Sequence, residues 1–348
     1  MSLQKPVDPA LPGAGPAAPG FAGSLLALAP GLLLVTAIGG TAYFLGTLHP
    51  SLDALALAIL LGILTRALAG TRQYSATAGV RWANRVFIPT GIILYGTRLD
   101  FARLAALPPV VIIVTVLTMA AFYAIILALH RFWPLRAKTA GLVAAGSAIC
   151  GASAIAVLSP VVEAEPEDTS IALLVITTVG LTGAMVYPLL RELTGMSDIL
   201  YAVLSGATLH QTGIVRIAVS NMEPLFVSFA LAVKTTRIVM LAGIAILTAI
   251  LHQRGRQKKE ISQAIGRVWF LAPFIAVGLA MSYLPGARSF FSLLSPAGTL
   301  IFSMALASIG LMVDIESVLE AGSRPLVIGF AGWILVVIIL LFSAPLFI

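Results

Sequence analysis

Long apolar segments constrain this chain more than any other feature of its sequence. A bilayer core about 30 Å thick takes about 20 helical residues to cross, and eleven segments approach or reach that length. Only 10% of the residues are Asp, Glu, Lys or Arg, against about 25% in a soluble domain. The segments lack strict alternation, which favours helices over barrel strands. We therefore predict an all-α polytopic membrane protein. The expected spans are 25–46, 52–69, 86–100, 108–129, 140–160, 169–190, 199–219, 226–251, 268–284, 297–313 and 326–346.

The basic residues predict the orientation. Alternating these spans places most of the 21 Lys and Arg residues on the side of the N-terminus, and leaves only Arg98, Arg103 and Arg288 on the other. Cytoplasmic loops carry an excess of Lys and Arg. We therefore expect a protein of the bacterial inner (plasma) membrane with a cytoplasmic N-terminus and a periplasmic or extracellular C-terminus. The same assignment places the acidic run Glu163 to Asp168 outside.

Two parts of the chain are distinguished by composition. Residues 1–24 are rich in Pro, Gly and Ala and predict a disordered cytoplasmic tail, whereas 25–348 form the transmembrane domain. Within that domain two weak self-matches suggest inverted repeats, approximately 108–190 and 268–346. Cys150 to Ala164 can be laid on Ala307 to Ala321, and alternatively Gly91 to Phe101 on Ala305 to Ile315.

Several function classes are disfavoured. Cys150 is the only cysteine, so neither a disulfide framework within the chain nor a cysteine-based metal site can form. The sequence contains no phosphate-binding glycine loop, no HExxH pair and no GxSxG elbow. The net charge of +7 is explained by cytoplasmic loops rather than by nucleic acid. We expect no enzyme, no cofactor, no metal and no nucleic-acid partner.

Three cations fall inside the expected spans, without any Asp or Glu at mid-span. They are Arg216, Lys234 and Arg237. A charge at the bilayer centre costs roughly 2.5–3.5 kcal/mol on insertion scales, so it faces a cavity or a partner. Lys234 and Arg237 share one helix face. Their partners are either backbone carbonyls at a broken helix or an anionic substrate; snorkelling, or pairing with Asp100 or Asp314, is the structural alternative.

Gly146 to Ile155 (GSAICGASAI) packs small residues into the middle of the span 140–160. One interpretation is a close helix crossing. The other is a discontinuous helix broken near Gly151, where Ser147 and Ser153 satisfy released backbone groups or bind a ligand. Cys150 itself is expected to be a packing residue at this site.

A second polar group lies in the span 199–219. His210 and Gln211 stand together at mid-span, followed by Thr212 and Gly213. His210 is either an interhelical hydrogen-bond partner or a proton-coupling group, since its ordinary pKa is accessible near neutral pH. Gln211 either donates to an oxyanion or bridges two helices.

These motifs carry a family resemblance. GSAICGASAI with the Pro160 to Ala164 segment, the Gly91 to Phe101 stretch, Gly206 to Val215 and Ala232 to Leu241 resemble the YeiH-like family of bacterial membrane proteins, whose members are described as sulfate exporters. One departure is Thr212 to Val215, where a more polar continuation is expected. The resemblance implies the architecture of sodium/proton antiporters and bile-acid transporters. That architecture has inverted repeats, crossed discontinuous helices in the spans 140–160 and 297–313, elevator-type alternating access and a homodimer.

The sequence thus predicts a secondary transporter of small anions, with sulfate or a related sulfur oxyanion or sulfonate as the exported substrate and a possible coupling to protons or sodium. The alternative is a cation/proton antiporter or a sodium-coupled organic-anion transporter on the same fold. A membrane enzyme or a sensor is the third class, for which no catalytic set is apparent. The predicted substrate-binding residues are Ser147, Cys150, Gly151, Ser153, His210, Gln211, Lys234 and Arg237.

Overall fold

The computed structural model describes residues 21–48, 52, 54–69, 78–133, 135–252, 266, 268–284, 286–313, 316 and 322–343. Within these ranges the regular structure consists of fourteen α-helices and one short 3-10 helix. Six of the described helices are long and apolar enough to cross a membrane by length and composition. The predicted all-α membrane protein is therefore confirmed.

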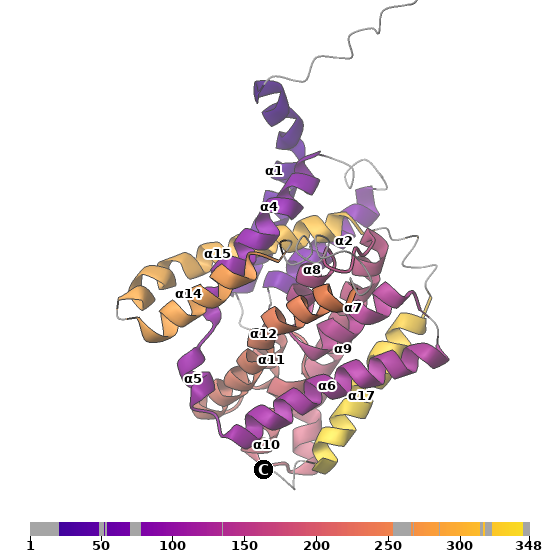
Figure 1. Ribbon diagram of the computed structural model, residues 1–348, viewed down its shortest axis with the longest axis vertical. Helices are drawn as coiled ribbons and strands as arrows, with labels where there is room; N and C mark the ends of the chain where they lie inside the picture. The colour runs from indigo at the N-terminus through magenta and orange to yellow at the C-terminus, as the bar shows by residue number, and fades with distance from the viewer. Residues whose placement is uncertain are drawn as a thin grey trace, which may run out of the picture.

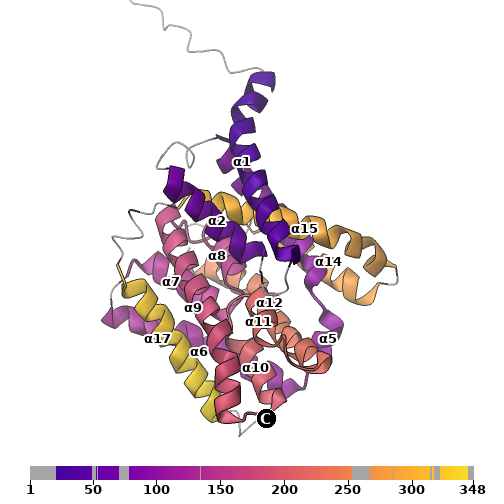
Figure 2. The ribbon, with the colours of Figure 1, turned by 180° about the vertical axis from the view of Figure 1, so that it is seen from behind.

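Five helices pack into one group, which we call the α15 bundle. Its central helix α15 (Ala287–Leu311) lies against the other four, and the 3-10 helix η1 (Gly96–Arg98) and the short helix α5 (Phe101–Ala105) lead out of it. The other members are α1 (Phe21–Leu48), α2 (Ala54–Ala69), α4 (Ala78–Tyr95) and α14 (Leu271–Tyr283). Figures 1 and 2 show these helices together at one end of the molecule.

The remaining eight helices form a second group, which we call the hairpin bundle (Figure 1). Most of its contacts are internal, and few helix pairs join it to the α15 bundle. Its members are α6 (Pro109–Phe132), α7 (Ala137–Ala148), α8 (Ala152–Leu158), α9 (Pro166–Thr194), α10 (Asp198–Thr208), α11 (Thr212–Ala218), α12 (Pro224–His252) and α17 (Arg324–Ser343).

Glycines allow the backbones to approach closely inside both bundles. In the α15 bundle Gly62 of α2 meets Gly310 of α15, where an added Cβ at Gly310 would lie 2.5 Å from the Ile59 carbonyl oxygen. In the hairpin bundle an added Cβ at Gly206 would lie 2.5 Å from the Ala230 carbonyl oxygen. These contacts fix α2 against α15 and α10 against α12.

The span 140–160 is broken as the small-residue motif suggested, but it does not cross. Helix α7 ends at Ala148, and after a turn α8 runs back along it, so that an added Cβ on Gly146 would touch the Ile155 side chain at 2.9 Å. At the open end the Lys138 Nζ donates to the Glu163 carbonyl oxygen at 2.5 Å. We call α7 and α8 hairpin one.

The span 199–219 is a second hairpin. Helix α10 ends at Thr208, α11 begins at Thr212, and the Tyr201 hydroxyl near the start of α10 donates to the Ala218 carbonyl oxygen at the end of α11. We call α10 and α11 hairpin two. The span 297–313, expected to hold the second break, lies mostly in the continuous α15. The expected discontinuity is therefore confirmed in 140–160, whereas the expected break in 297–313 and the crossing of two broken helices are wrong.

The two hairpins change the predicted sidedness of two loops. Arg136 precedes hairpin one and forms ion pairs with Glu165 and Glu167 at 2.6 and 2.7 Å, so both ends of the hairpin lie on one side. The placement of the acidic run Glu163 to Asp168 opposite Arg136 is therefore wrong. Because α9 begins on the side of Arg136 and ends on the other, the predicted placement of Arg191 on the side of the N-terminus is wrong as well. Since two spans turn back, the odd number of crossings is retained, and the orientation of the termini stays a prediction.

The ends of the chain are covered in part. Residues 1–20 of the predicted tail lie outside the described residues, whereas Phe21 to Ser24 belong to α1. The two repeat alignments stay predictions. Asp314 lies outside the described residues, and in the range 268–346 the helices α14 and α15 are each continuous, so neither contains a break like that of hairpin one.

Candidate functional site

The tips of the two hairpins meet at the centre of the molecule. Gly151 at the tip of hairpin one has φ +73° and ψ −124°, a backbone conformation that only glycine adopts readily. A Cβ added there would lie 2.8 Å from the Gln211 Cγ and 3.3 Å from the His210 carbonyl oxygen. The glycine therefore provides both the turn of hairpin one and the close approach of hairpin two.

Lys234 and Arg237 of α12 tie the two tips together. Lys234 Nζ donates to the carbonyl oxygens of Leu209 and His210 at 2.8 and 2.6 Å, and to that of Ile149 at 3.1 Å. Arg237 donates to the carbonyl oxygens of Ala148 and Leu209, both at 2.8 Å, of Gly206 at 3.1 Å, and of Ser147. Both cations thus reach the last carbonyls of α7 and α10, which lack partners within their own helices.

These contacts favour one of the two partners that the sequence allowed. Both side chains are completely buried, and their hydrogen-bond partners among the described residues are backbone carbonyls at broken helices. The helix dipoles place partial negative charge at those ends, so the cations are stabilised without a carboxylate. Lys234 and Arg237 consequently position the tips and do not line the cavities described below.

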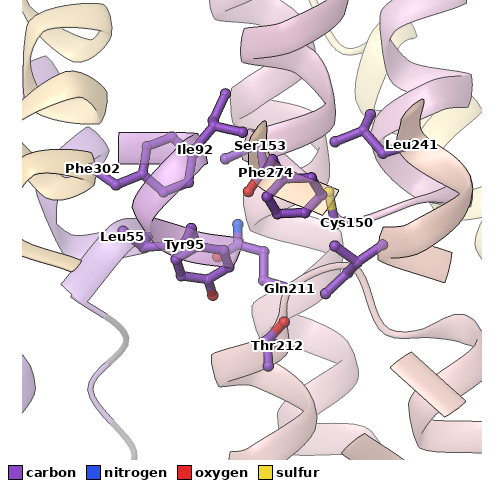
Figure 3. A pocket seen from close by; sticks show the side chains of 12 residues that line it. Leu55, Ile92, Tyr95, Cys150, Ser153, Gln211, Thr212, Leu241, Phe274 and Phe302 are labelled. Atoms are coloured by element: carbon purple, nitrogen blue, oxygen red, sulfur yellow. The ribbon is translucent and has the colours of Figure 1, made fainter. Parts of the chain in front are cut away.

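A small central pocket lies between the tips and the α15 bundle (Figure 3). Its volume of about 20 Å³ suits one water molecule. Figure 3 places Gln211 and Thr212 on one side and the rings of Tyr95 and Phe302 opposite them. The lining residues are Leu55, Ile92, Tyr95, Cys150, Ala152, Ser153, Gln211, Thr212, Ile238, Leu241, Phe274 and Phe302.

A larger cavity of about 730 Å³ opens beside the central pocket, and we call it the Arg98 vestibule. It shares Leu55, Tyr95, Thr212 and Ile238 with the central pocket, so the two spaces adjoin. Its charged lining residues are Arg98, Arg103, Arg216 and Asp100.

The charges of the Arg98 vestibule are unevenly paired. Asp100 forms an ion pair with Arg103 at 3.0 Å. Arg98 donates to the Thr299 hydroxyl at 2.8 Å and lies over the Tyr95 ring, 5.1 Å from its centroid. Arg216 is exposed on α11. Two guanidinium groups therefore face this cavity without a described carboxylate to balance them.

A third cavity of about 580 Å³, the Arg81 vestibule, lies between the bundles near hairpin one. Arg81 and Arg85 of α4 are its charged lining residues within the described part of the chain. Trp269 and Phe270 supply aromatic surface, and Ala156 of α8 forms part of the wall. Both large cavities thus carry positive charge.

The predicted site residues fall into two sets. Cys150, Ser153 and Gln211 line the central pocket, and Gly151 forms the tip beside it. His210 is completely buried between Phe122 and Gly180 and lines none of the three cavities, and neither ring nitrogen has a described hydrogen-bond partner. The Ser147 hydroxyl is likewise buried without a described partner.

The sequence interpretation missed the residues that charge the vestibules. From the sequence, Arg98, Arg81 and Arg85 serve only to orient the chain, and Arg216 is one of the cations inside the spans without being a predicted substrate-binding residue. A signal was available in Arg98 and Arg103, because they break the rule that places basic residues on the cytoplasmic side. Such exceptions indicate a local need for positive charge.

The fold and site define a multi-pass helical membrane protein in which two hairpin tips meet between two bundles. A family described as Conserved hypothetical protein 698 matches residues 30–329. The chain is 34% identical over 305 residues to a UPF0324 membrane protein of Archaeoglobus fulgidus, covering 87% of this chain and 88% of that one. It is 31% identical over 323 residues to the UPF0324 inner membrane protein YeiH of Escherichia coli (strain K12), covering 88% and 91%. The chain belongs to the UPF0324 membrane protein family.

The comparisons confirm the resemblance to YeiH-like proteins and the location in the inner membrane. A UPF0324 membrane protein of Bacillus cereus is 29% identical over 282 residues, or 80% of this chain and 79% of that one. No solved structure matches the chain. Sulfate export, homodimerisation and the coupling ion stay predictions.

Proposed function

We propose that the protein is a secondary transporter of small anions, with sulfate, related sulfur oxyanions and sulfonates as the first candidate substrates. The observation that carries the proposal is the charge of the cavities. Among the described lining residues of all three, the charged groups are arginines and Asp100, which Arg103 pairs. Clefts lined by one sign of charge concentrate ions of the opposite sign.

The arrangement supports alternating access. The three cavities lie between the α15 bundle and the hairpin bundle, so a displacement of one bundle against the other changes which vestibule reaches the central pocket. In this proposal the hairpin bundle carries the substrate past the α15 bundle. Lys234 and Arg237 keep both tips in register during the movement.

The charge pattern disfavours the cation antiporter. A cation site in hydrocarbon needs carboxylates or several free carbonyls. No carboxylate lines the central pocket among the residues described, and the tip carbonyls of Leu209 and His210 already accept from Lys234.

Reconstitution into liposomes tests the proposal. Uptake of labelled sulfate, sulfite, methanesulfonate and ethanesulfonate is measured with and without a proton gradient, beside sodium and lithium as cation substrates. At least one anion should enter faster than in empty liposomes, and Arg216→Gln should slow that entry about tenfold, the loss expected for one charge contact worth about 1.4 kcal/mol. Arg131→Gln is the matched control, because Arg131 is exposed and lines none of the described cavities. Transport of sodium or lithium without any anion would refute the proposal.

A further inference from the structure

The central pocket has two chemically different halves. Hairpin tips supply the hydroxyls of Ser153 and Thr212 and the amide of Gln211. The Gln211 Oε1 has no described partner, and its Nε2 makes one long contact of 3.5 Å to the Thr177 hydroxyl. The amide can therefore turn its NH₂ group toward an anion.

The α15 bundle supplies apolar and aromatic side chains to the other half. Tyr95 and Phe302 pack with ring centroids 5.5 Å apart, and Phe274 completes the wall with 1% of its surface exposed. Apart from the hydroxyl of Tyr95, this wall has no polar group that could form a hydrogen bond with an oxygen of the substrate.

Full positive charge is present near the pocket but not on its surface. Lys234 and Arg237 are completely buried behind the tips and donate to carbonyl oxygens. Arg98 and Arg216 line the vestibule and are absent from the lining of the central pocket. An anion that leaves the vestibule therefore loses contact with cations as well as with water.

This environment discriminates by charge. The free energy needed to remove an ion from water rises steeply with the charge of the ion, and hydrogen bonds from neutral donors offset only part of it. A singly charged headgroup can be held by Ser153, Gln211 and Thr212, whereas a dianion needs a counter-charge that the lining does not supply.

Resting on the proposed function, we infer that the central pocket, once the movement of the bundles widens it beyond its volume of about 20 Å³ in this structure, selects a singly charged organic anion with a small apolar group, of the short alkanesulfonate class, over a bare dianion such as sulfate. The headgroup faces the hairpin tips, and the alkyl group lies against Tyr95, Phe274 and Phe302. These three aromatic residues set the specificity for the apolar part of the substrate.

A chain-length series in the wild-type protein tests the inference. Methanesulfonate, ethanesulfonate and propanesulfonate are measured as substrates in proteoliposomes, and sulfate is measured beside them at the same pH. Apparent affinity should rise about fourfold per methylene group until the pocket is filled. Sulfate should have a kcat/KM at least about tenfold lower than ethanesulfonate, because its second charge is uncompensated.

A variant locates the effect. Phe274→Leu should flatten the dependence on chain length while methanesulfonate is still transported, and Phe290→Leu is the matched control because Phe290 is 61% exposed and lines none of the described cavities. Sulfate transported as well as or better than the alkanesulfonates, with no dependence on chain length, overturns this inference and leaves anion transport standing. Transport of none of these anions overturns the proposed function and this inference with it.

Discussion

Hairpins one and two share a design but place their charges differently. In both, a longer limb ends in carbonyls that Lys234 and Arg237 hold, and a limb of seven residues returns. The returning limb of hairpin one, α8, carries no charged residue and borders the Arg81 vestibule. That of hairpin two, α11, carries Arg216 and borders the Arg98 vestibule.

The bases of the hairpins differ as well. Hairpin one is closed by Arg136, which pairs with Glu165 and Glu167, while the buried Asp168 accepts from the Thr139 hydroxyl at 2.6 Å. Hairpin two is closed instead by the hydrogen bond from the Tyr201 hydroxyl to the Ala218 carbonyl oxygen, and the ion pair of Arg191 with Asp198 joins the end of α9 to the start of α10. The charged groups at the base of hairpin one therefore hold the two ends of that hairpin together, whereas the charged Arg216 on the returning limb of hairpin two faces a cavity where it can contact a ligand.

The strongest test of what the hairpins share is Arg237→Met. The substitution removes the side-chain donor of the buried Ser147, Ala148 and Gly206 carbonyls, while Lys234 still donates to Leu209. Unsatisfied buried polar groups cost about 1–3 kcal/mol each. We expect a loss of roughly 3 kcal/mol or more, measured as thermal unfolding in detergent. Arg131→Met, at an exposed position, should change stability by less than about 0.5 kcal/mol. Equal melting of the two variants would show that the tips do not depend on Arg237.

A smaller effect is expected at the tip of hairpin one. Gly151→Ala places a Cβ at a positive φ and 2.8 Å from the Gln211 Cγ. Gly195→Ala also has a positive φ, +62°, but its Cβ meets nothing within 4 Å. The left-handed helical conformation of Gly195 costs an alanine roughly 1–2 kcal/mol. At Gly151 the ψ of −124° places the backbone in a region that only glycine adopts readily, so the excess loss there combines backbone strain with the contact between the tips. Similar melting temperatures for the two variants would argue against a tight contact.

The smallest effect is expected at the base of hairpin one. The hydrogen bond to Glu165 and the neighbouring carboxylates raise the pKa of Arg136. Because the pKa of Arg136 is higher in the folded protein than in the unfolded chain, its stabilising effect is fully present at every pH below the unfolded-state pKa. The effect is lost only as the pH rises through the pKa of the folded state. Since the Arg136 side chain is 47% exposed, Arg136→Gln should cost less than about 1 kcal/mol, and equally at pH 6 and pH 9. Melting curves at both values check this, and a cost present at only one pH would contradict it.

The sequence predicted where the helices lie along the chain better than whether each apolar segment crosses the membrane or turns back. Apolar segments located α2, α6, α12 and α17 to within a few residues, because burial in lipid dictates such runs. A break near Gly151 was one of the two interpretations that the small residues allowed, and the structure selects it. The return of α8 was not, because 140–160 is long enough to cross and only contacts such as that of Arg136 with Glu165 reveal the reversal.

The second hairpin and the central cations show the same limit. The break at Leu209 to Gln211 contains no glycine, so His210 and Gln211 were recognised as polar residues but not as a turn. For Lys234 and Arg237 the sequence left carbonyls and substrate as equal partners. The choice depends on where α7 and α10 end in space, which their spacing from α12 along the chain does not encode.

Ligand-induced stabilisation of the purified protein tests the anion-carrier claim most directly. A ligand present at 100 times its dissociation constant adds about 2.7 kcal/mol to the folded state. We predict that methanesulfonate, ethanesulfonate or sulfate raises the melting temperature of the wild-type protein, that sodium and lithium do not, and that Arg216→Gln weakens the response while Arg131→Gln keeps it. Stabilisation by sodium or lithium with silence to every anion would contradict the account.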